Sequence, residues 1–268
     1  MGTIFQWNPA DIEDLLATCE TDGLLPLILK YMPQGSTILE SGCGLGRYVK
    51  YLEDRGWHTV GLEWSQETLK AMHGVWPEMK VVVGDSANSP FPENIFDGVL
   101  SLGVVEHWSE GLEAPLRDIY RVLKPKGVAI ISVPCLNRVR QIKRRLFYYE
   151  FRALMGCIIK RKWKAMNRFK NEYKYVVYPA AGEFFEYRLT KDEYLYEVKQ
   201  VGFEVLEHLP LGEIDGIYHE LNPLKLIVRF GNWKFKVSAV AGALNEILRK
   251  WAFFHCHMQV AVVFKPPR

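Results

Sequence analysis

The segment with the clearest chemical potential is residues 38–46, which read ILESGCGLG. An acidic residue, Glu40, precedes three glycines at alternate positions, and the glycines allow a tight turn and close approach of a ligand to the backbone. The segment does not fit GxxxxGK[ST], so it does not predict a P-loop. Dinucleotide and phosphate sites use similar loops, so the glycines alone leave the ligand open.

Two more acidic residues follow the next two predicted strands. Glu63 ends the segment 58–63, and Asp85 follows the segment 80–83. Carboxylates at the ends of adjacent parallel strands share one edge of the sheet, where such folds bind ligands. The three acids suit a ligand with a ribose, an adenine and a positive charge, and they would repel a phosphate-rich dinucleotide. The structural alternatives are a carboxylate at a helix N-terminus for Glu40 and a turn residue for Asp85.

Short apolar runs alternate with helix-like runs between Thr37 and Pro134. The runs are rich in Val, Ile and Leu with little alternation, which is typical of strands covered on both faces. We therefore expect a parallel sheet with helices on both sides. The predicted strands are 37–41, 58–63, 80–83, 96–102 and 127–133, and the predicted helices are 46–55, 65–73 and 113–123, the last ended by residues 124–127.

The pattern changes after Pro134. A basic stretch comes first, and regularity returns at a predicted helix over 190–201, with Thr190 as N-cap and Glu193 completing a capping box. A strand over 203–209, an amphipathic helix over 237–254 and a last strand over 257–264 follow. The chain is interpreted as one α/β domain interrupted by a basic insertion.

These segments together resemble the class I S-adenosylmethionine-dependent methyltransferases of the type 11 small-molecule group. The matching residues are 38–46, GLEWS at 61–65, and the segments 81–108, 116–134 and 186–207. The resemblance implies a Rossmann-like seven-stranded sheet with helices on both faces, its last strand antiparallel. It also implies S-adenosyl-L-methionine as the cofactor. Glu40 replaces the Asp that is usual in the first motif and keeps its charge.

The resemblance also implies which residues bind the cofactor. Glu40 and the loop residues Gly42, Cys43, Gly44 and Gly46 would hold the methionine moiety, and Glu63 the ribose. Trp64, Asp85 and Ser86 would lie near the adenine, and Ser101, Leu102 and Gly103 near the sulfonium. Trp64 has core packing as its alternative.

His107 is the candidate catalytic residue, because it follows the fourth predicted strand at the ligand-binding edge and a histidine can accept a proton near neutral pH. A structural histidine that caps the next helix is the alternative. No metal site is expected. Some relatives have a metal site with the pattern E-x-x-E-H, but Gly103 replaces its first acid here, and in His255-Cys256-His257 only one pair would face the same way on a strand.

The resemblance divides the chain into three parts. Residues 1–134 hold N-terminal helices and the cofactor-binding half of the core, 135–185 form a basic helical lid insertion, and 186–268 complete the core with a second helical insertion at about 211–255. The expected reaction is in-line transfer of a methyl group to a small-molecule or lipid-like acceptor. The alternatives are an RNA or membrane-associated methyltransferase that uses the basic insertion, and a non-catalytic cofactor-binding protein. A nicotinamide-dependent oxidoreductase is disfavoured, because the pair Tyr120 and Lys124 lies too close to the next strand.

Positive charge is concentrated in one segment of an otherwise acidic chain. Residues 138–174 hold 13 Lys and Arg and two acids, a net charge of +11, whereas the whole chain has 34 − 31 = +3. Three interpretations stay open: a solvated lid face, attraction to an anionic membrane surface or an acidic carrier, and, less favoured, binding to nucleic acid. The helix over 237–254 is expected to pack on the core or lid rather than to anchor in a membrane.

Length and composition complete the expectations. The chain has 268 residues, of which 49% are hydrophobic and 24% charged, typical of an ordinary globular domain. No apolar run has the length of about 18–20 residues that spans a bilayer, and no signal peptide is expected at residues 1–11. Five scattered cysteines predict free thiols and a cytoplasmic protein, peripheral to a membrane if the basic segment binds one. The oligomeric state is not predicted.

Overall fold

The computed structural model describes residues 9–146, 170–171, 175–178, 184–222, 226–231 and 233–267. Its centre is a seven-stranded sheet in the order β3-β2-β1-β4-β5-β12-β9. Strand β12 is antiparallel to both of its neighbours, while β1 to β5 pair in parallel with one another. The predicted sheet with an antiparallel last strand is confirmed.

The strands of the sheet are β1 (Thr37–Ser41), β2 (His58–Glu63), β3 (Val81–Val83), β4 (Phe96–Leu102), β5 (Leu123–Pro134), β9 (Glu204–Leu211) and β12 (Met258–Phe264). The helices that flank it are α1 (Ile12–Thr18), α2 (Leu25–Tyr31), α3 (Arg47–Glu53), α4 (Gln66–Val75), α5 (Glu113–Val122) and α8 (Lys191–Gln200). Short helices η1 (Pro9–Asp11) and η2 (Val105–His107) precede α1 and follow β4.

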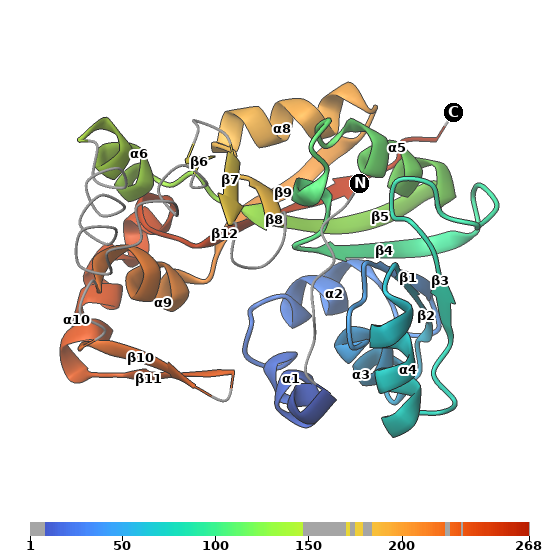
Figure 1. Ribbon diagram of the computed structural model, residues 1–268. Coiled ribbons are helices and arrows are strands. Elements are labelled where there is room, and N and C mark those ends of the chain that lie inside the picture. Colours follow the sequence, from blue (N-terminus) through green and yellow to red (C-terminus); the bar gives the residue numbers. More distant parts are fainter. Residues whose placement is uncertain are drawn as a thin grey trace.

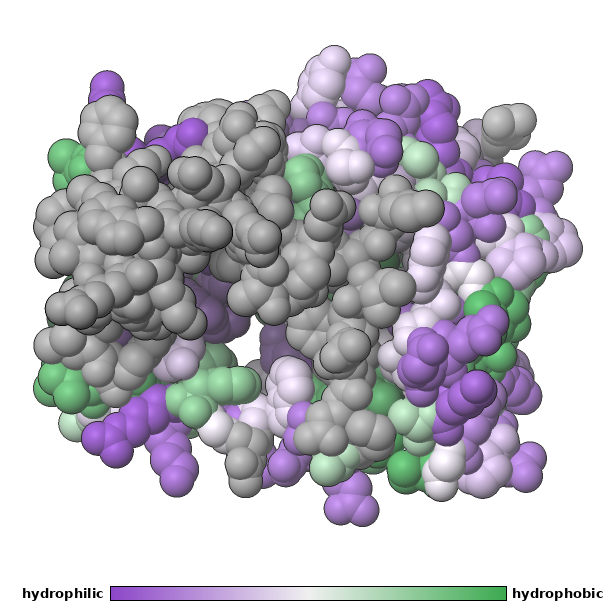
Figure 2. Space-filling model, in the orientation of Figure 1, coloured by the Kyte–Doolittle hydropathy of each residue, from purple (hydrophilic) through white to green (hydrophobic). Residues whose placement is uncertain are grey.

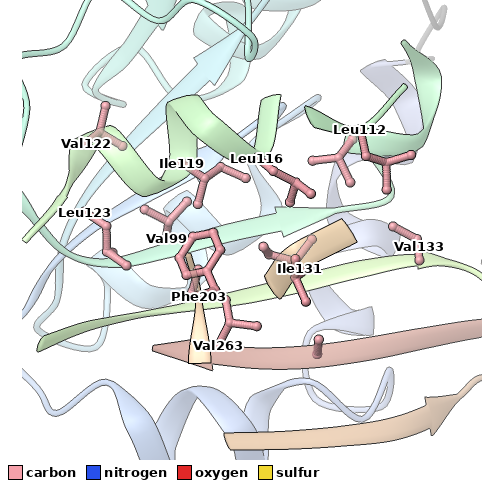
Figure 3. Close-up of a cluster of buried hydrophobic side chains, with 14 of the residues drawn as sticks. Val99, Leu112, Leu116, Ile119, Val122, Leu123, Ile131, Val133, Phe203 and Val263 are labelled. Atoms are coloured by element: carbon pink, nitrogen blue, oxygen red, sulfur yellow. The ribbon is translucent and has the colours of Figure 1, made fainter. Parts of the chain in front are cut away.

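Helices cover both faces of the sheet (Figure 1). On one face, α5 and α8 pack on β4, β5 and β12, and the side chains of Leu116, Ile119, Val99, Ile131 and Val263 lie in this cluster (Figure 3). On the other face, a second cluster joins α2 and α3 to the same strands. Burial of side chains of this size stabilises a fold by about 1.5–3 kcal/mol each. The sheet is therefore a rigid base that fixes where its strand ends lie.

Two local predictions about helix starts are confirmed. The Ser65 hydroxyl accepts a hydrogen bond from Thr68 N at the start of α4, and Thr190 and Glu193 form a capping box at the start of α8. The predicted helix end before residues 124–127 is confirmed to within one residue, because α5 ends at Val122, and residues 124–127 themselves belong to β5. Phe96 pairs with Leu123 and Gly98 with Val128, so residues 124–127 of β5 bulge out opposite the single residue 97 of β4.

Two insertions lie beyond the carboxyl ends of the parallel strands (Figure 1). The first begins with α6 (Arg138–Arg145) and later has a small sheet of β6 (Lys170–Asn171), β7 (Tyr175–Tyr178) and β8 (Phe184–Tyr187). The second has α9 (Glu213–Gly216), the π-helical turn η4 (Ile217–Leu221), the hairpin of β10 (Val228–Gly231) and β11 (Lys234–Val237), α10 (Ala239–Leu248) and η5 (Arg249–Phe254). Most of the basic stretch 138–174 lies outside the described residues, so its predicted role as a lid is not tested.

The predicted helix over 237–254 is wrong in two ways. Val237 ends the strand β11, and the helical course breaks at Trp251, whose φ of −123° and ψ of 43° are not helical. The expected burial is only partial: Ala241 is buried in a cluster against which Leu244 packs, whereas Val240, Ile247 and Trp251 are each about two-thirds exposed. No helix in the described ranges combines the length and the apolar character needed to cross a bilayer.

Candidate active site

The glycine loop after β1 has the conformation that its glycines allow. Gly42, Gly44 and Gly46 have φ values of 75°, 55° and 71°, in the left-handed region that disfavours other residues. A Cβ on Gly42 would lie 2.6 Å from the side chain of Val104, so this position has no room for one. Backbone N–H groups of Gly42 and Cys43 donate to the Leu62 carbonyl at 2.8 and 2.9 Å, which ties the loop to β2.

Glu40 lies beneath this loop and is buried. Its Oε2 accepts a hydrogen bond from the backbone N–H of Val49, in the first turn of α3, at 3.0 Å. The structural alternative for Glu40, a carboxylate at a helix N-terminus, is therefore observed. Burial raises the pKa of Glu40 to about 8, although the positive charge of Arg47 acts in the opposite direction. A buried carboxyl with a raised pKa beside a glycine loop is typical of functional sites.

Glu63 joins the ends of β1 and β2. Its Oε2 accepts from the backbone N–H of Gly44 at 2.9 Å, and its Oε1 accepts from the backbone N–H of Ser65 at 2.9 Å. The side chain is only partly buried, so the carboxylate lies at the surface of the loop. Glu63 therefore contacts the glycine turn directly, whereas Glu40 contacts the helix that follows the turn.

Asp85 and Trp64 continue the same edge. The Asp85 carboxylate accepts from Ala87 N at 2.8 Å in a turn that also pairs Asp85 with Asn88. The neighbouring Ser86 is buried. Trp64 is 41% exposed, so the alternative of core packing is wrong for this residue. It directly follows Glu63 in the sequence, and its exposed surface is available to a ligand.

The end of β4 presents two buried polar groups. Ser101 is fully buried, and its hydroxyl has no hydrogen-bond partner in the described part of the chain. Glu106 is also buried, its Oε2 is likewise unpartnered there, and burial raises its pKa well above the usual range. Between them the chain turns at Leu102 and at Gly103, which has a φ of 73° and donates its N–H to the Ser132 carbonyl. Unsatisfied buried groups cost about 1–3 kcal/mol each, which makes this strand end a candidate for a functional site.

His107 lies in η2, directly after this turn. Its Nδ1 is 2.7 Å from the carbonyl oxygen of Phe185 in β8, and its Nε2 is 4.0 Å from Oε1 of Glu106. The contact with a carbonyl indicates that Nδ1 carries the proton. His107 does not cap the next helix, because α5 has Leu112 as its N-cap and no side-chain cap. The capping alternative is therefore wrong.

A cavity of about 570 Å³ lies at the same edge of the molecule. Its walls come from α1, the start of α3, the α9–η4 segment and the hairpin β10–β11, and Figure 2 shows the molecule hollowed between the hairpin and the part that carries α1. Arg47 lies in this wall. Its Nη1 donates a hydrogen bond to Thr18 Oγ1 at 2.5 Å and forms an ion pair with Asp22 Oδ2 at 2.8 Å. The lining residues are Leu15, Thr18, Thr21, Asp22, Arg47, Asp215, Tyr218, His219, Phe230, Trp233 and Phe235. The sequence did not single out this wall, because its parts are far apart along the chain.

Asp215, His219 and His257 bring three potential metal ligands together beside this cavity. His219 Nε2 is 3.2 Å from Asp215 Oδ1, and the two imidazole rings stack at 4.5 Å. However, Arg140 Nη2 donates to Nδ1 of His257 at 2.8 Å. An arginine has no lone pair to accept with, so the neutral His257 ring carries its proton on Nε2. The cluster as arranged therefore presents a hydrogen-bond donor where a metal would need a lone pair.

A protein-family model described as "Methyltransferase domain" matches residues 39–131, which contain the glycine loop, Glu63, Asp85 and His107. The chain carries a class I methyltransferase domain. The cofactor of this family is S-adenosylmethionine, and the expectation of this family and cofactor is confirmed.

Two curated relatives and one solved structure show how far the similarity extends. A probable S-adenosylmethionine-dependent methyltransferase of Mycolicibacterium smegmatis is 30% identical over 39% of this chain and 40% of its own length. The tRNA (carboxymethyluridine(34)-5-O)-methyltransferase of Saccharomyces cerevisiae is 31% identical over 38% of this chain and 37% of its own. The chain thus spans about two-fifths of each relative. The PH0226 protein of Pyrococcus horikoshii has the same fold, with a TM-score of 0.57, 18% identity and coverage of 93% of this chain and 91% of its own.

Proposed function

We propose that this protein transfers a methyl group from S-adenosylmethionine to a small-molecule or lipid-like acceptor by in-line displacement. The observation that supports this proposal most strongly is the glycine turn tied to Glu63 through Gly44 N–H, with the buried Glu40 bonded to Val49 N–H and with Asp85 in the turn after the neighbouring strand β3. A carboxylate favours a ligand with hydroxyl and cationic groups and disfavours a phosphate-rich one. These three carboxylates therefore fit a sulfonium nucleoside better than a dinucleotide.

The cofactor, when bound, supplies an electrophilic methyl group, and the protein orients the partners and excludes water. In this proposal Glu63 accepts the hydrogen bonds of the ribose hydroxyls, with Trp64, Asp85 and Ser86 near the adenine. The residues Glu40, Gly42, Cys43, Gly44 and Gly46 hold the methionine moiety. Ser101, Leu102 and Gly103 lie beneath the reacting centre, where the unpartnered Ser101 hydroxyl offers a donor.

Two histidines are candidates to take the proton of a hydroxyl acceptor. His107 has its Nδ1 fixed on the Phe185 carbonyl, which holds the ring in one orientation. His219 lines the cavity and has its Nε2 fixed by Asp215, which leaves Nδ1 as its basic nitrogen. We favour His107, because it follows β4 next to the expected sulfonium position, and keep His219 as the alternative on the acceptor side.

An RNA acceptor is the second candidate function. It is supported by the tRNA methyltransferase activity for which the yeast relative is named and by the net charge of +11 over residues 138–174. The small-molecule proposal is favoured by the cavity, whose aromatic lining from Tyr218, Phe230 and Phe235 suits an apolar acceptor body. A cytoplasmic location is proposed from the free thiols of Cys19, Cys43, Cys135 and Cys256.

The decisive experiment is calorimetry with S-adenosylhomocysteine on the wild type and on Glu63→Gln. Loss of a hydrogen bond to a charged carboxylate predicts an affinity loss of about 1.5–3 kcal/mol. Glu93→Gln, at an exposed position before β4 and so at the opposite edge of the sheet, is the matched control and should bind like the wild type. Equal binding by all three proteins, or tighter binding of NADH, would overturn the assignment.

Turnover then separates the candidates for the acceptor. Release of S-adenosylhomocysteine would be followed with tRNA, with small phenolic or hydroxylated compounds, and with lipid vesicles. Product formed with tRNA and with no other acceptor would favour the RNA alternative. Cofactor binding without any turnover would favour the non-catalytic protein. The rates of methyl transfer by His107→Gln and His219→Gln to the acceptor that gives product decide between the two histidines. Replacement of the true base is expected to lower this rate by about 100-fold or more.

A further inference from the structure

The second insertion carries an unusual share of the exposed apolar surface. Of the sixteen large apolar side chains that are exposed in the described ranges, seven lie within residues 226–254, although this segment is about a tenth of the chain. They are Leu226, Phe230, Val237, Val240, Ile247, Trp251 and Phe254, with between 36% and 67% of their surface open. Exposed apolar groups gathered in this way mark a binding surface more often than scattered ones do.

The same segment is cationic. Residues 226–254 hold five Lys and Arg against the single acid Glu246, a net charge of 5 − 1 = +4. Arg229, Lys234, Lys236 and Lys250 are exposed, and none of these four forms an ion pair with an acid of the described chain. Along the sequence the charged residues alternate with the apolar ones, and Arg249 and Lys250, for example, directly precede Trp251.

The hairpin shows how the two kinds of residue are sorted. In the register of β10 and β11, Arg229 lies opposite Lys236, and Phe230 lies opposite Phe235. Directly opposed residues point to the same face, so one face of the hairpin is apolar and turns toward Tyr218, whereas the other carries the cations. Two like charges directly opposite each other destabilise a hairpin, unless an anionic partner compensates them.

The hairpin and helices form one continuous region with α6 of the first insertion. Strand β11 runs directly into α10 and η5, and η5 contacts α6, on which Ile142 and Leu146 are also exposed. Val240 and Ile247 are two turns apart on the same side of α10. Figure 1 places these elements at the periphery, and Figure 2 shows green and purple side chains side by side where the hairpin lies. We name residues 226–254 the basic apolar surface.

We propose that the basic apolar surface binds an anionic lipid bilayer. An interfacial protein surface combines aromatic and aliphatic side chains that enter the acyl boundary with Lys and Arg that meet the headgroups, and this combination is present here. A second copy of the chain does not fit as well, because it would bring five cations against five. A nucleic acid would use the cations but leave Val240 and Ile247 without a suitable contact.

The position of this surface adds a consequence that rests on the proposed function. Phe230 is exposed on the basic apolar surface and also lines the cavity, together with Phe235 from the same hairpin. A bilayer held against the hairpin therefore lies beside the cavity mouth. An apolar acceptor would enter from the lipid phase without crossing water. The binding itself does not depend on catalysis, so its test is separate from that of the methyl transfer.

The test is co-sedimentation with vesicles of phosphatidylcholine that contain about 30% phosphatidylserine, at about 0.15 M salt, compared with pure phosphatidylcholine. The wild type should bind the anionic vesicles and release them at about 0.5 M salt. The double variant Lys234→Gln/Lys236→Gln should bind about 30-fold more weakly, because each cation near the surface contributes about fivefold. The variant Ile247→Ser/Trp251→Ser should lose at least tenfold through its apolar contacts.

Matched controls separate this surface from general effects. Leu29 on α2 and Tyr196 on α8 are exposed to a similar degree, so Leu29→Ser/Tyr196→Ser should bind like the wild type. Circular dichroism verifies folding, and if the apolar variant unfolds, the charge variant alone decides. Unchanged vesicle binding by the charge variant would overturn the proposal, because it would assign the binding to another segment. If the wild type binds no vesicles and the variants instead lose a dimer seen in sedimentation, the surface binds a second copy of the chain. If the wild type binds no vesicles and the variants instead lose tRNA binding, the surface binds a nucleic acid. Either result would overturn the proposal.

Discussion

The two ends of the sheet are held together in different ways. At the β1–β2–β3 end, backbone groups of the loops meet carboxylates that are near in sequence: Glu63 binds Gly44 N–H and Ser65 N–H, and Glu40 binds Val49 N–H. At the β12–β9 end, a buried ion network joins residues that are more than seventy positions apart. The first arrangement leaves groups near the surface for a ligand, whereas the second uses its polar groups to attach an insertion.

Arg140 is the centre of the second arrangement. It is almost fully buried and donates to Glu220 Oε1 at 2.7 Å, to the Cys135 carbonyl at 2.5 Å and to His257 Nδ1 at 2.8 Å. Lys143 adds a second contact to Glu220 at 3.0 Å. These bonds hold the carboxyl of Glu220 ionised and keep its pKa below the usual range, against the effect of burial. Arg140 and Glu220 thus connect α6, η4 and the start of β12.

The largest effect is expected when this network is broken. Arg140→Met leaves Glu220 as a buried charge with Lys143 alone, and removing one partner of a buried pair costs about 3–5 kcal/mol of the free energy of unfolding. Urea unfolding followed by circular dichroism measures the loss. Arg117→Met is the control, because its ion pair with Glu113 is exposed and is expected to contribute less than about 1 kcal/mol.

A double variant sharpens this test. Arg140→Met/Glu220→Leu removes both charges and should recover part of the lost stability, because a buried pair can be replaced by apolar groups at little cost. If Arg140→Met is no more harmful than Arg117→Met, the network does not hold the insertion. The two ends of the sheet would then not differ in the way described.

The second expected effect concerns Glu40 and depends on pH. The raised pKa of about 8 means that the folded protein favours the protonated carboxyl. The stability that this group contributes is complete below its usual pKa of about 4.5 and is lost as the pH rises through about 8. Glu106, whose pKa is also raised by burial, acts in the same direction.

Glu40→Gln should therefore be nearly as stable as the wild type at about pH 4.5 and more stable than it at about pH 9, by about 2–5 kcal/mol, because the wild type loses stability throughout this range. The glutamine oxygen can still accept from Val49 N–H, so the capping contact is kept. Unfolding curves at the two pH values measure the difference, with the exposed Glu20→Gln as control. The same variant should bind S-adenosylhomocysteine more weakly. A variant that is less stable than the wild type at both pH values would contradict the raised pKa.

The two ends of the sheet also differ in how well the sequence predicts them. The bounds of β1, β2 and β4, the N-cap Ser65 and the capping box at Thr190 could be predicted, because local spacing determines them. The position of Glu63 at the end of β2, next to the glycine loop, followed from the same local pattern. The cavity and the pair of Asp215 and His219 could not, because they depend on how η4 and the hairpin fold back over α1.

Arg140 shows the limit most clearly. In the sequence it is one of many cations in a basic stretch, and that composition predicts an exposed charged face. In the structure it is buried, because Glu220 and the His257 carbonyl supply hydrogen-bond partners from distant segments, and the Cys135 carbonyl supplies one from nearby. The hydrophobic pattern over 237–254 was misleading in the opposite direction: apolar spacing predicts burial, and here several of the large apolar side chains, such as Val240, Ile247 and Trp251, remain exposed.

The smallest expected effect concerns Trp64, and it tests whether the β1–β3 end leaves its side chains available to a ligand. Because Trp64 is 41% exposed, Trp64→Ala should change the free energy of unfolding by less than about 0.5 kcal/mol. If the ring flanks the adenine, the same variant should lose about 1 kcal/mol of affinity for S-adenosylhomocysteine, the usual contribution of an aromatic stacking contact. Trp57→Ala, which removes a buried ring bonded to the Met32 carbonyl, is the contrasting control and should cost about 3–5 kcal/mol of stability. A Trp64→Ala protein with reduced stability and unchanged affinity would show that this ring supports the fold and not the ligand.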